Sequence, residues 1–127
     1  MLENVGEEAF YGCSSMTYAY LHSSVANVGG RAFAESGLVQ LYWYTQTPVA
    51  DECFKDCEAL STIGWGGTAT TNPSGFGREA FYGCTGFSEF KVPKEAFFVG
   101  DEAFGGRNAV PLKLVFTSQE PPKLGVL

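Results

Sequence analysis

The cysteines and the histidine are the side chains of this sequence best suited to metal binding or covalent chemistry. The chain has four cysteines and one histidine: Cys13, Cys53, Cys57, Cys84 and His22. Cys53 and Cys57 are separated by three residues rather than the two usual in a zinc knuckle, and no second pair completes a set of four ligands. We therefore predict no metal site and no cofactor.

A cysteine–histidine nucleophile is also disfavoured by position. Such a pair needs His22 beside one thiolate, with a third group to orient the imidazole ring. The repeats described below place His22 at the end of a strand and Cys13 on the opposite wall. Gly64 to Thr68 lacks the lysine and the spacing of a phosphate-binding loop. We predict that the chain has no catalytic residues and is not an enzyme.

Internal repetition organises the chain. Residues 6–15 (GEEAFYGCSS) and 77–86 (GREAFYGCTG) agree at seven of ten positions. A weaker pattern, apolar-Gly-x-x-Ala-Phe, predicts about five units of about 23 residues in one domain, 1–127. Repeats of this length indicate a solenoid, in which stacked units share one core. The units open at Val5, Val28, Val49, Phe76 and Val99, and Leu124 opens a sixth.

Each unit has two predicted walls. The Ala-Phe segment predicts a short turn of α or 3₁₀ helix, and acidic residues at its start would stabilise the helix dipole. These acids are Glu7, Glu8, Glu52, Glu79, Asp101 and Glu102. Apolar residues at alternate positions later in the unit predict a half-buried strand, and strands of neighbouring units would pair about 4.8 Å apart in a parallel sheet.

Columns follow from this stacking, because equivalent residues of successive units lie above one another. One predicted column is Phe10, Phe33, Phe54, Phe81 and Phe104. Cys13, Cys57 and Cys84 share another position, where buried packing is favoured over a disulfide or a metal site. Ser36 and Arg107 replace cysteine in that column, so the geometry of the wall is in question in units two and five.

The outward strand face carries the candidate binding residues. Alternation directs one side of each strand to solvent, and on the first two strands that side is rich in tyrosine, which is favoured at interfaces. We predict a ligand-binding patch there, with aromatic cross-strand pairing that only stabilises the sheet as the alternative. Its residues are Tyr18, Tyr20, His22, Gln40, Tyr42 and Tyr44.

Composition narrows the range of partners. Eight Lys and Arg against 14 Asp and Glu give a net charge of -6, which opposes binding to nucleic acid or anionic lipid. No apolar run is long enough to insert in a membrane, and the acidic start does not resemble a signal peptide. Both ends fall inside a unit, so we expect an excerpt of a longer array whose uncapped ends could self-associate.

The unit resembles the BspA-like class of leucine-rich repeat. Gly77 to Cys84, followed by Phe87, Phe90, Val92 and Pro93, is the closest copy of that motif, and residues 44–48 and 117–121 resemble the alternative Thr-x-x-Pro turn of the family. The resemblance implies an α/β solenoid, a right-handed superhelix with parallel strands on one face and short helical turns on the other.

The resemblance also implies a function. Such proteins are non-catalytic binding or adhesion modules of bacterial cell-surface or secreted proteins that contact host or matrix proteins. From this we expect an extracellular or cell-surface location and a protein partner on the strand face. Two alternatives stay open: a structural spacer array, and a glycan-binding accessory segment of a larger protein.

Overall fold

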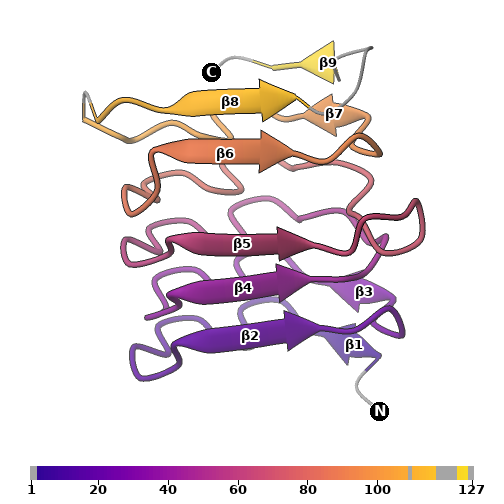
Figure 1. Cartoon of the computed structure of the whole chain (residues 1–127). Coiled ribbons are helices and arrows are strands. Elements are labelled where there is room, and N and C mark those ends of the chain that lie inside the picture. The colour runs from indigo at the N-terminus through magenta and orange to yellow at the C-terminus, as the bar shows by residue number, and fades with distance from the viewer. Residues whose placement is uncertain (1–2, 109, 117–122, 126–127) are drawn as a thin grey trace.

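The chain folds as a parallel β-solenoid of about five turns, seen in the computed structural model in Figure 1. The structure describes residues 3–108, 110–116 and 123–125. Longer strands form one face of the solenoid, short strands form a second ladder, and turns close the third side. The second predicted Thr-x-x-Pro turn, residues 117–121, lies outside the described residues.

The strand face consists of two parallel sheets. The first contains β2 (Tyr18–Leu21), β4 (Gln40–Trp43) and β5 (Thr62–Trp65), in that order. The second pairs β6 (Glu89–Val92) with β8 (Lys113–Phe116). Exposed and buried residues alternate in β2 and β6 as the sequence pattern predicted, and Leu41 and Trp43 of β4 are buried, whereas the last three residues of β5 and of β8 are half-buried. The repeats pair in phase: Ala19 pairs with Leu41, which pairs with Ile63.

The prediction of one continuous sheet was wrong at a single junction, between β5 and β6 (Figure 1). No Cα of β5 lies within 8 Å of a Cα of β6. The rings of Trp65, Phe76 and Phe90 form a triangle at this junction, with ring centroids 5.7 to 5.8 Å apart. Trp65 lies within the longest interval between unit openings, from Val49 to Phe76, and the two strands separate in this longer turn.

The second ladder repeats once per turn. It is built from β1 (Asn4–Val5), β3 (Asn27–Val28), β7 (Phe98–Val99) and β9 (Lys123–Leu124), with single bridges Val49–Phe76 and Phe76–Val99 between. The first residues of the predicted units therefore form this ladder. Since the ladder connects Val49 to Phe76, the two halves of the solenoid stay joined here where β5 and β6 separate.

The predicted helical turns were also wrong, because the described residues contain no helix and the fold is all β. In each unit the residue before the Ala position has a positive φ of 52° to 56°. This is a left-handed backbone conformation, which is incompatible with a right-handed helix. These residues are Glu8, Arg31, Glu52, Glu79 and Glu102. The Ala-Phe segments are instead series of tight turns, with bonds such as the one from the N–H of Cys13 to the carbonyl of Phe10.

Backbone bonds between neighbouring units replace the bonds of a helix. The N–H of Phe33 donates to the carbonyl of Cys53 at 2.9 Å, and that of Phe54 to the carbonyl of Ala80 at 2.8 Å. Glu35 and Lys55 make an equivalent bond at 2.8 Å. The turns are thus held to one another across the stack, as the strands are.

The acidic residues at these turns cannot act through a helix dipole, because there is no helix. Glu52 and Glu79 instead form ion pairs with Lys55 and Arg78, both within their own unit and across to the neighbouring unit. Arg78 contacts Glu52 and Glu79, each at 2.9 Å, and Lys55 contacts Glu79 at 2.9 Å and Glu52 at 3.4 Å. Partial burial acts to raise the pKa of Glu52, but Lys55 and Arg78 outweigh it and hold the pKa below its ordinary value.

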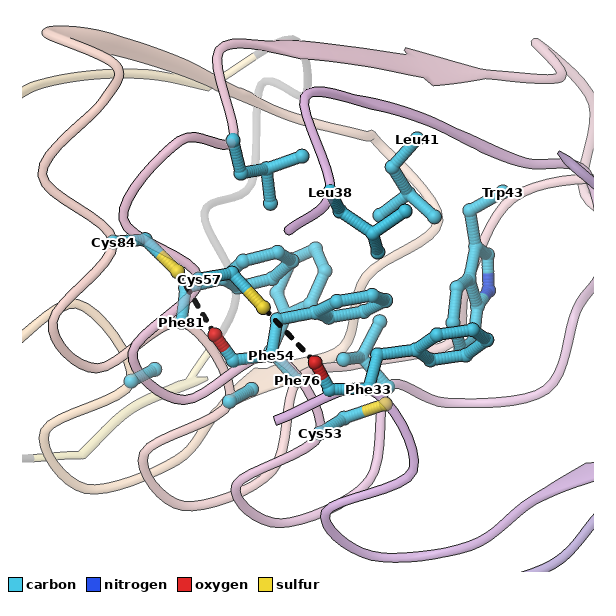
Figure 2. Close-up of a cluster of buried hydrophobic side chains, with 14 of the residues drawn as sticks. Phe33, Leu38, Leu41, Trp43, Cys53, Phe54, Cys57, Phe76, Phe81 and Cys84 are labelled. Atoms are coloured by element: carbon cyan, nitrogen blue, oxygen red, sulfur yellow. Dashed lines mark hydrogen bonds between the residues drawn. The ribbon is translucent and has the colours of Figure 1, made fainter. Parts of the chain in front are cut away.

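The core follows the predicted phenylalanine column, part of which is drawn in Figure 2. Consecutive rings stack nearly parallel, with centroids 5.2, 5.3, 5.3 and 5.8 Å apart. The cysteine column runs beside it: the thiols of Cys57 and Cys84 donate to the carbonyls of Phe33 and Phe54, each at 3.0 Å (Figure 2). Buried packing is confirmed for Cys57 and Cys84, whereas Cys13 at the end of the column is half-buried, and the cysteines are free thiols.

The two substitutions in the cysteine column keep the wall intact. Ser36 is buried, and its hydroxyl lies 3.4 Å from the sulfur of Cys57. Arg107 is also buried, and its guanidinium donates to four main-chain oxygens. Those oxygens belong to Cys84, Phe87, Val110 and Pro111. A buried arginine thus joins unit four to unit five without a carboxylate.

Candidate functional site

The structure brings together the tyrosines that the sequence predicted. Tyr18 and Tyr20 lie on β2, Tyr42 lies on β4, and Tyr44 directly follows β4. We call these four residues the tyrosine block. Their Cα register pairs Tyr20 with Tyr42, yet the rings meet diagonally: Tyr18 contacts Tyr42 with centroids 5.7 Å apart, and Tyr20 contacts Tyr44 at 5.2 Å. A two-by-two array of rings therefore forms on the outward face.

This array presents both apolar rings and polar ends to solvent. Tyr18 is 52% exposed and Tyr20 48% exposed, while Tyr42 and Tyr44 are half-buried by their neighbours. Within the described residues, no hydrogen bond uses the hydroxyl of any of the four. The rings hold one another in place and leave their hydroxyl groups available to a partner.

Gly64 on β5 creates the space that Tyr42 occupies. It is the residue opposite Tyr42 in the sheet, and a Cβ there would lie 2.6 Å from Cδ1 of the Tyr42 ring. The ring of Tyr42 therefore lies over the glycine. Any side chain at position 64 would displace it and disturb the array.

His22 and Gln40 border the tyrosine block. The ring of His22 lies 6.3 Å from that of Tyr20, and its Nδ1 accepts the N–H of Ser24 at 3.3 Å. Gln40 is exposed, between Tyr18 and Thr62 in the sheet register. Both residues lie where the sequence placed them, and each leaves hydrogen-bonding groups directed to solvent beside the aromatic rings.

Sequence reasoning missed a groove on the same face. It runs between β5 and β6, has a volume of about 390 Å³, and is lined by Ser61, Thr62, Ile63 and Trp65 on one side. Phe87, Glu89, Phe90 and Lys91 line the other side. The 27-residue interval between the openings of units three and four, with a tryptophan in an inward strand position, was the available signal.

Three of the four cysteines, Cys53, Cys57 and Cys84, are buried. Burial raises the pKa of the thiols of Cys53, Cys57 and Cys84, so these groups are neutral and unreactive near pH 7. His22 lies on the exposed strand side, apart from the buried cysteine column. Over residues 3–108, 110–116 and 123–125, no cluster of three or more His, Cys, Asp or Glu side chains could hold a metal ion.

No helix long and apolar enough for a bilayer occurs in the described part of the chain.

Comparison with known proteins identifies a family but no individual relative. The family described as "BspA type Leucine rich repeat region" matches residues 1–110 in six copies. No curated protein and no solved structure matches the chain. The matched copies cover most of the chain and agree with the stacked columns, the parallel ladders and the phenylalanine wall.

Three general properties accompany this family. Leucine-rich repeats suggest protein-interaction or adhesion modules, their solenoids are typically non-catalytic scaffolds, and the BspA type is associated with surface proteins. From its repeats and its solenoid, the chain belongs to the BspA-type leucine-rich repeat family.

Proposed function

We propose that this chain is a non-catalytic protein-binding module that contacts its partner through the tyrosine block on the strand face. The observation that carries the proposal is the diagonal array of four tyrosine rings with exposed edges and free hydroxyls. Ring contacts already restrict these side chains before binding, so little side-chain entropy is lost when a partner covers them. Tyrosine is also among the residues enriched at interfaces.

The neighbouring surface supports contact with a protein. The outward residues around the tyrosine block are small or polar. They lie on the paired strands β2, β4 and β5, which hold them in a regular surface. Gln40, Thr62 and His22 supply hydrogen-bonding groups at the border. An aromatic centre with a polar rim is the usual arrangement of an interaction surface. In keeping with the family, we propose a location on the cell surface or outside the cell.

The experiment compares two matched variants on an array of purified host-surface and matrix proteins. In the first variant, Tyr18, Tyr20, Tyr42 and Tyr44 are all replaced by Ser. In the second, Lys113 on β8 of the same face is replaced by Ser, which leaves the residues that line the groove between β5 and β6 unchanged. We expect biolayer interferometry to show at least a tenfold loss of affinity in the tyrosine variant and little loss in the second.

The same experiment separates the alternatives. Cross-strand ring contacts also stabilise a sheet, so circular dichroism and thermal unfolding must first show that the tyrosine variant keeps its fold. If that folded variant retains every interaction of the parent chain, the tyrosine block is not the contact surface and the spacer alternative is favoured. Binding of oligosaccharides that quenches tyrosine fluorescence, without any protein ligand, would favour the glycan-binding alternative.

A further inference from the structure

The groove between β5 and β6 is wider than the spacing of two paired strands. Paired strands lie about 4.8 Å apart, so two strands with a vacant position between them are about 9.6 Å apart. No Cα of β5 lies within 8 Å of a Cα of β6, and Figure 1 shows the wider interval. At the same junction the rings of Phe54 and Phe81 are stacked at 5.3 Å. The groove therefore opens only on the strand face.

Unpaired backbone groups line both sides of the groove. In the neighbouring pairs, outward residues donate to the preceding strand, as Thr62 does to Val39 at 3.1 Å. By this pattern, Ile63 on β5 and Glu89 and Lys91 on β6 direct their N–H groups into the groove. Among the described residues, no backbone hydrogen bond joins the two strands. Each side of the groove thus presents backbone hydrogen-bond donors and acceptors with the regular spacing that they have along a β-strand.

Trp65 forms the floor of the groove and partly replaces the missing pairing. Its indole N–H donates to the main-chain oxygen of Lys91 at 2.7 Å. In the register of the neighbouring pairs, that oxygen would accept the backbone N–H of Trp65 itself. The indole also contacts the rings of Phe76 and Phe90. Only a small inward side chain fits above such a floor.

The rim of the groove carries one charge of each sign. Glu89 and Lys91 are both outward and exposed, and neither makes an ion pair within the described residues. A strand placed in the groove would set one outward side chain beside Glu89 and the next, two residues later, beside Lys91. Opposite charges across a strand pair are favourable and like charges are unfavourable.

We propose that this groove binds an extended peptide segment as an additional parallel strand. The segment carries a basic residue beside Glu89, a small residue directed inward over Trp65, and an acidic residue beside Lys91. Its backbone bonds the free groups of β5 and β6 and completes the sheet, which is the mode of recognition called β-augmentation. This site is separate from the tyrosine block, and it does not depend on the function proposed above.

The test uses a synthetic peptide, acetyl-Thr-Lys-Ala-Glu-Ala-Thr-amide, and ¹⁵N-labelled protein in solution. The matched control is the same peptide with N-methyl groups on the Lys and Glu amides, which keeps every side chain and removes two donors to β5. We expect the first peptide to shift the amide signals of Ile63, Glu89 and Lys91, and the N-methylated peptide to bind at least tenfold more weakly. The Ser variant of the tyrosine block should bind both peptides as the parent chain does.

Hydrogen exchange tests the groove without any peptide. On β5, the N–H of Ile63 faces the groove and that of Gly64 faces β4; on β6, the N–H of Glu89 faces the groove and that of Phe90 faces β8. We expect at least tenfold faster exchange at Ile63 and Glu89 than at their neighbours, and slower exchange once the peptide is added.

Four results would overturn the proposal. The first is equal protection of these amides in the free protein, which would mean that the sheet is closed. The second is no shift at millimolar peptide, and the third is equal binding of the N-methylated peptide. The fourth is protection of Ile63 and Glu89 that rises with protein concentration alone, because a second copy of the chain would then occupy the groove.

Discussion

The rings of Phe54 and Phe81 are stacked at 5.3 Å with 11° between their planes, although the strands of the same two turns are too far apart to pair. The phenylalanine wall and the second ladder therefore connect the two halves of the solenoid. Within the described residues, the strand face contributes there the bond from Trp65 to Lys91 and the contact between the rings of Trp65 and Phe90. Stability should accordingly be more sensitive to changes in the wall than to changes at the groove.

Phe54→Ala should destabilise the chain strongly. Its ring is fully buried and contacts Phe33, Trp43 and Phe81. Removing a buried phenylalanine ring leaves a cavity and costs about 3–5 kcal/mol. The free energy of unfolding in urea measures this loss. Phe97→Ala is the control, because that ring is 72% exposed and its removal should change stability by less than about 0.5 kcal/mol. Similar losses in both variants would contradict the role given to the wall.

Thr45→Val should show that a hydroxyl holds the first Thr-x-x-Pro turn. Thr45 is 2% exposed; its hydroxyl donates to the carbonyl of Val25 at 2.6 Å and accepts the N–H of Thr47 at 3.3 Å. Valine has the same shape but leaves both backbone groups without this partner, at a cost of about 1–3 kcal/mol. Thermal unfolding measures the effect. Thr62→Val on the exposed side of β5 is the matched control and should be nearly neutral.

Glu102→Val should destabilise the last described Ala-Phe turn through the backbone. Glu102 has a φ of 52°, a conformation that β-branched residues strongly resist, so we expect a loss of about 1–2 kcal/mol. Glu102→Gly, which adopts this φ freely, should keep most of the stability. An unchanged unfolding midpoint in Glu102→Val would show that the turn tolerates an ordinary backbone conformation there. Glu7→Val, at a position without positive φ, serves as the control for loss of the charge.

The cysteines should react with a thiol reagent in two classes. Cys13 is half-buried, whereas Cys53, Cys57 and Cys84 are buried. In native protein we expect one thiol to react readily with 5,5′-dithiobis(2-nitrobenzoate), and the other three to react only after unfolding in guanidinium chloride. Cys13→Ser should abolish the fast reaction. Rapid modification of all four thiols in the native state would contradict the buried column.

Alkaline pH should weaken the fold through the same three thiols. Burial raises their pKa in the folded chain, so the folded state keeps protons that the unfolded chain releases above its ordinary thiol pKa of about 8.5. Stability from this source is therefore complete below about pH 8 and declines as the pH rises further. Urea unfolding at pH 7 and pH 10 measures the decline. Replacing all three cysteines by Ala should reduce its slope, at some cost in packing.

Much of the fold could be predicted from the sequence, because a repeat places equivalent residues in columns. The spacing of the units was enough to predict the phenylalanine wall, the parallel strands and the alternation that exposes Tyr18 and Tyr20. The tyrosine block was predicted for the same reason, since its residues occupy equivalent positions in adjacent units. Its role as a binding surface stays a proposal.

The helical turns were predicted wrongly because the local sequence pattern does not reveal the sign of the backbone angle φ. Alanine and glutamate favour helices, yet Glu52 and Glu79 adopt positive φ. In the stacked structure their N–H groups donate to the carbonyls of Arg78 and Asp101 in the next units, at 2.8 and 2.9 Å. Bonds between residues more than twenty positions apart thus overrule the local preference.

What the sequence determined by itself was the period of the chain, and with it the residues that share a column. Only the tertiary structure decided which side chains of neighbouring columns contact one another and where the strands separate. The diagonal contact of Tyr18 with Tyr42, the ring of Tyr42 over Gly64, and the gap between β5 and β6 all depend on the shapes of side chains from different turns. Repetition fixes which residues are neighbours, but the packing of side chains from different turns decides how closely those turns approach one another.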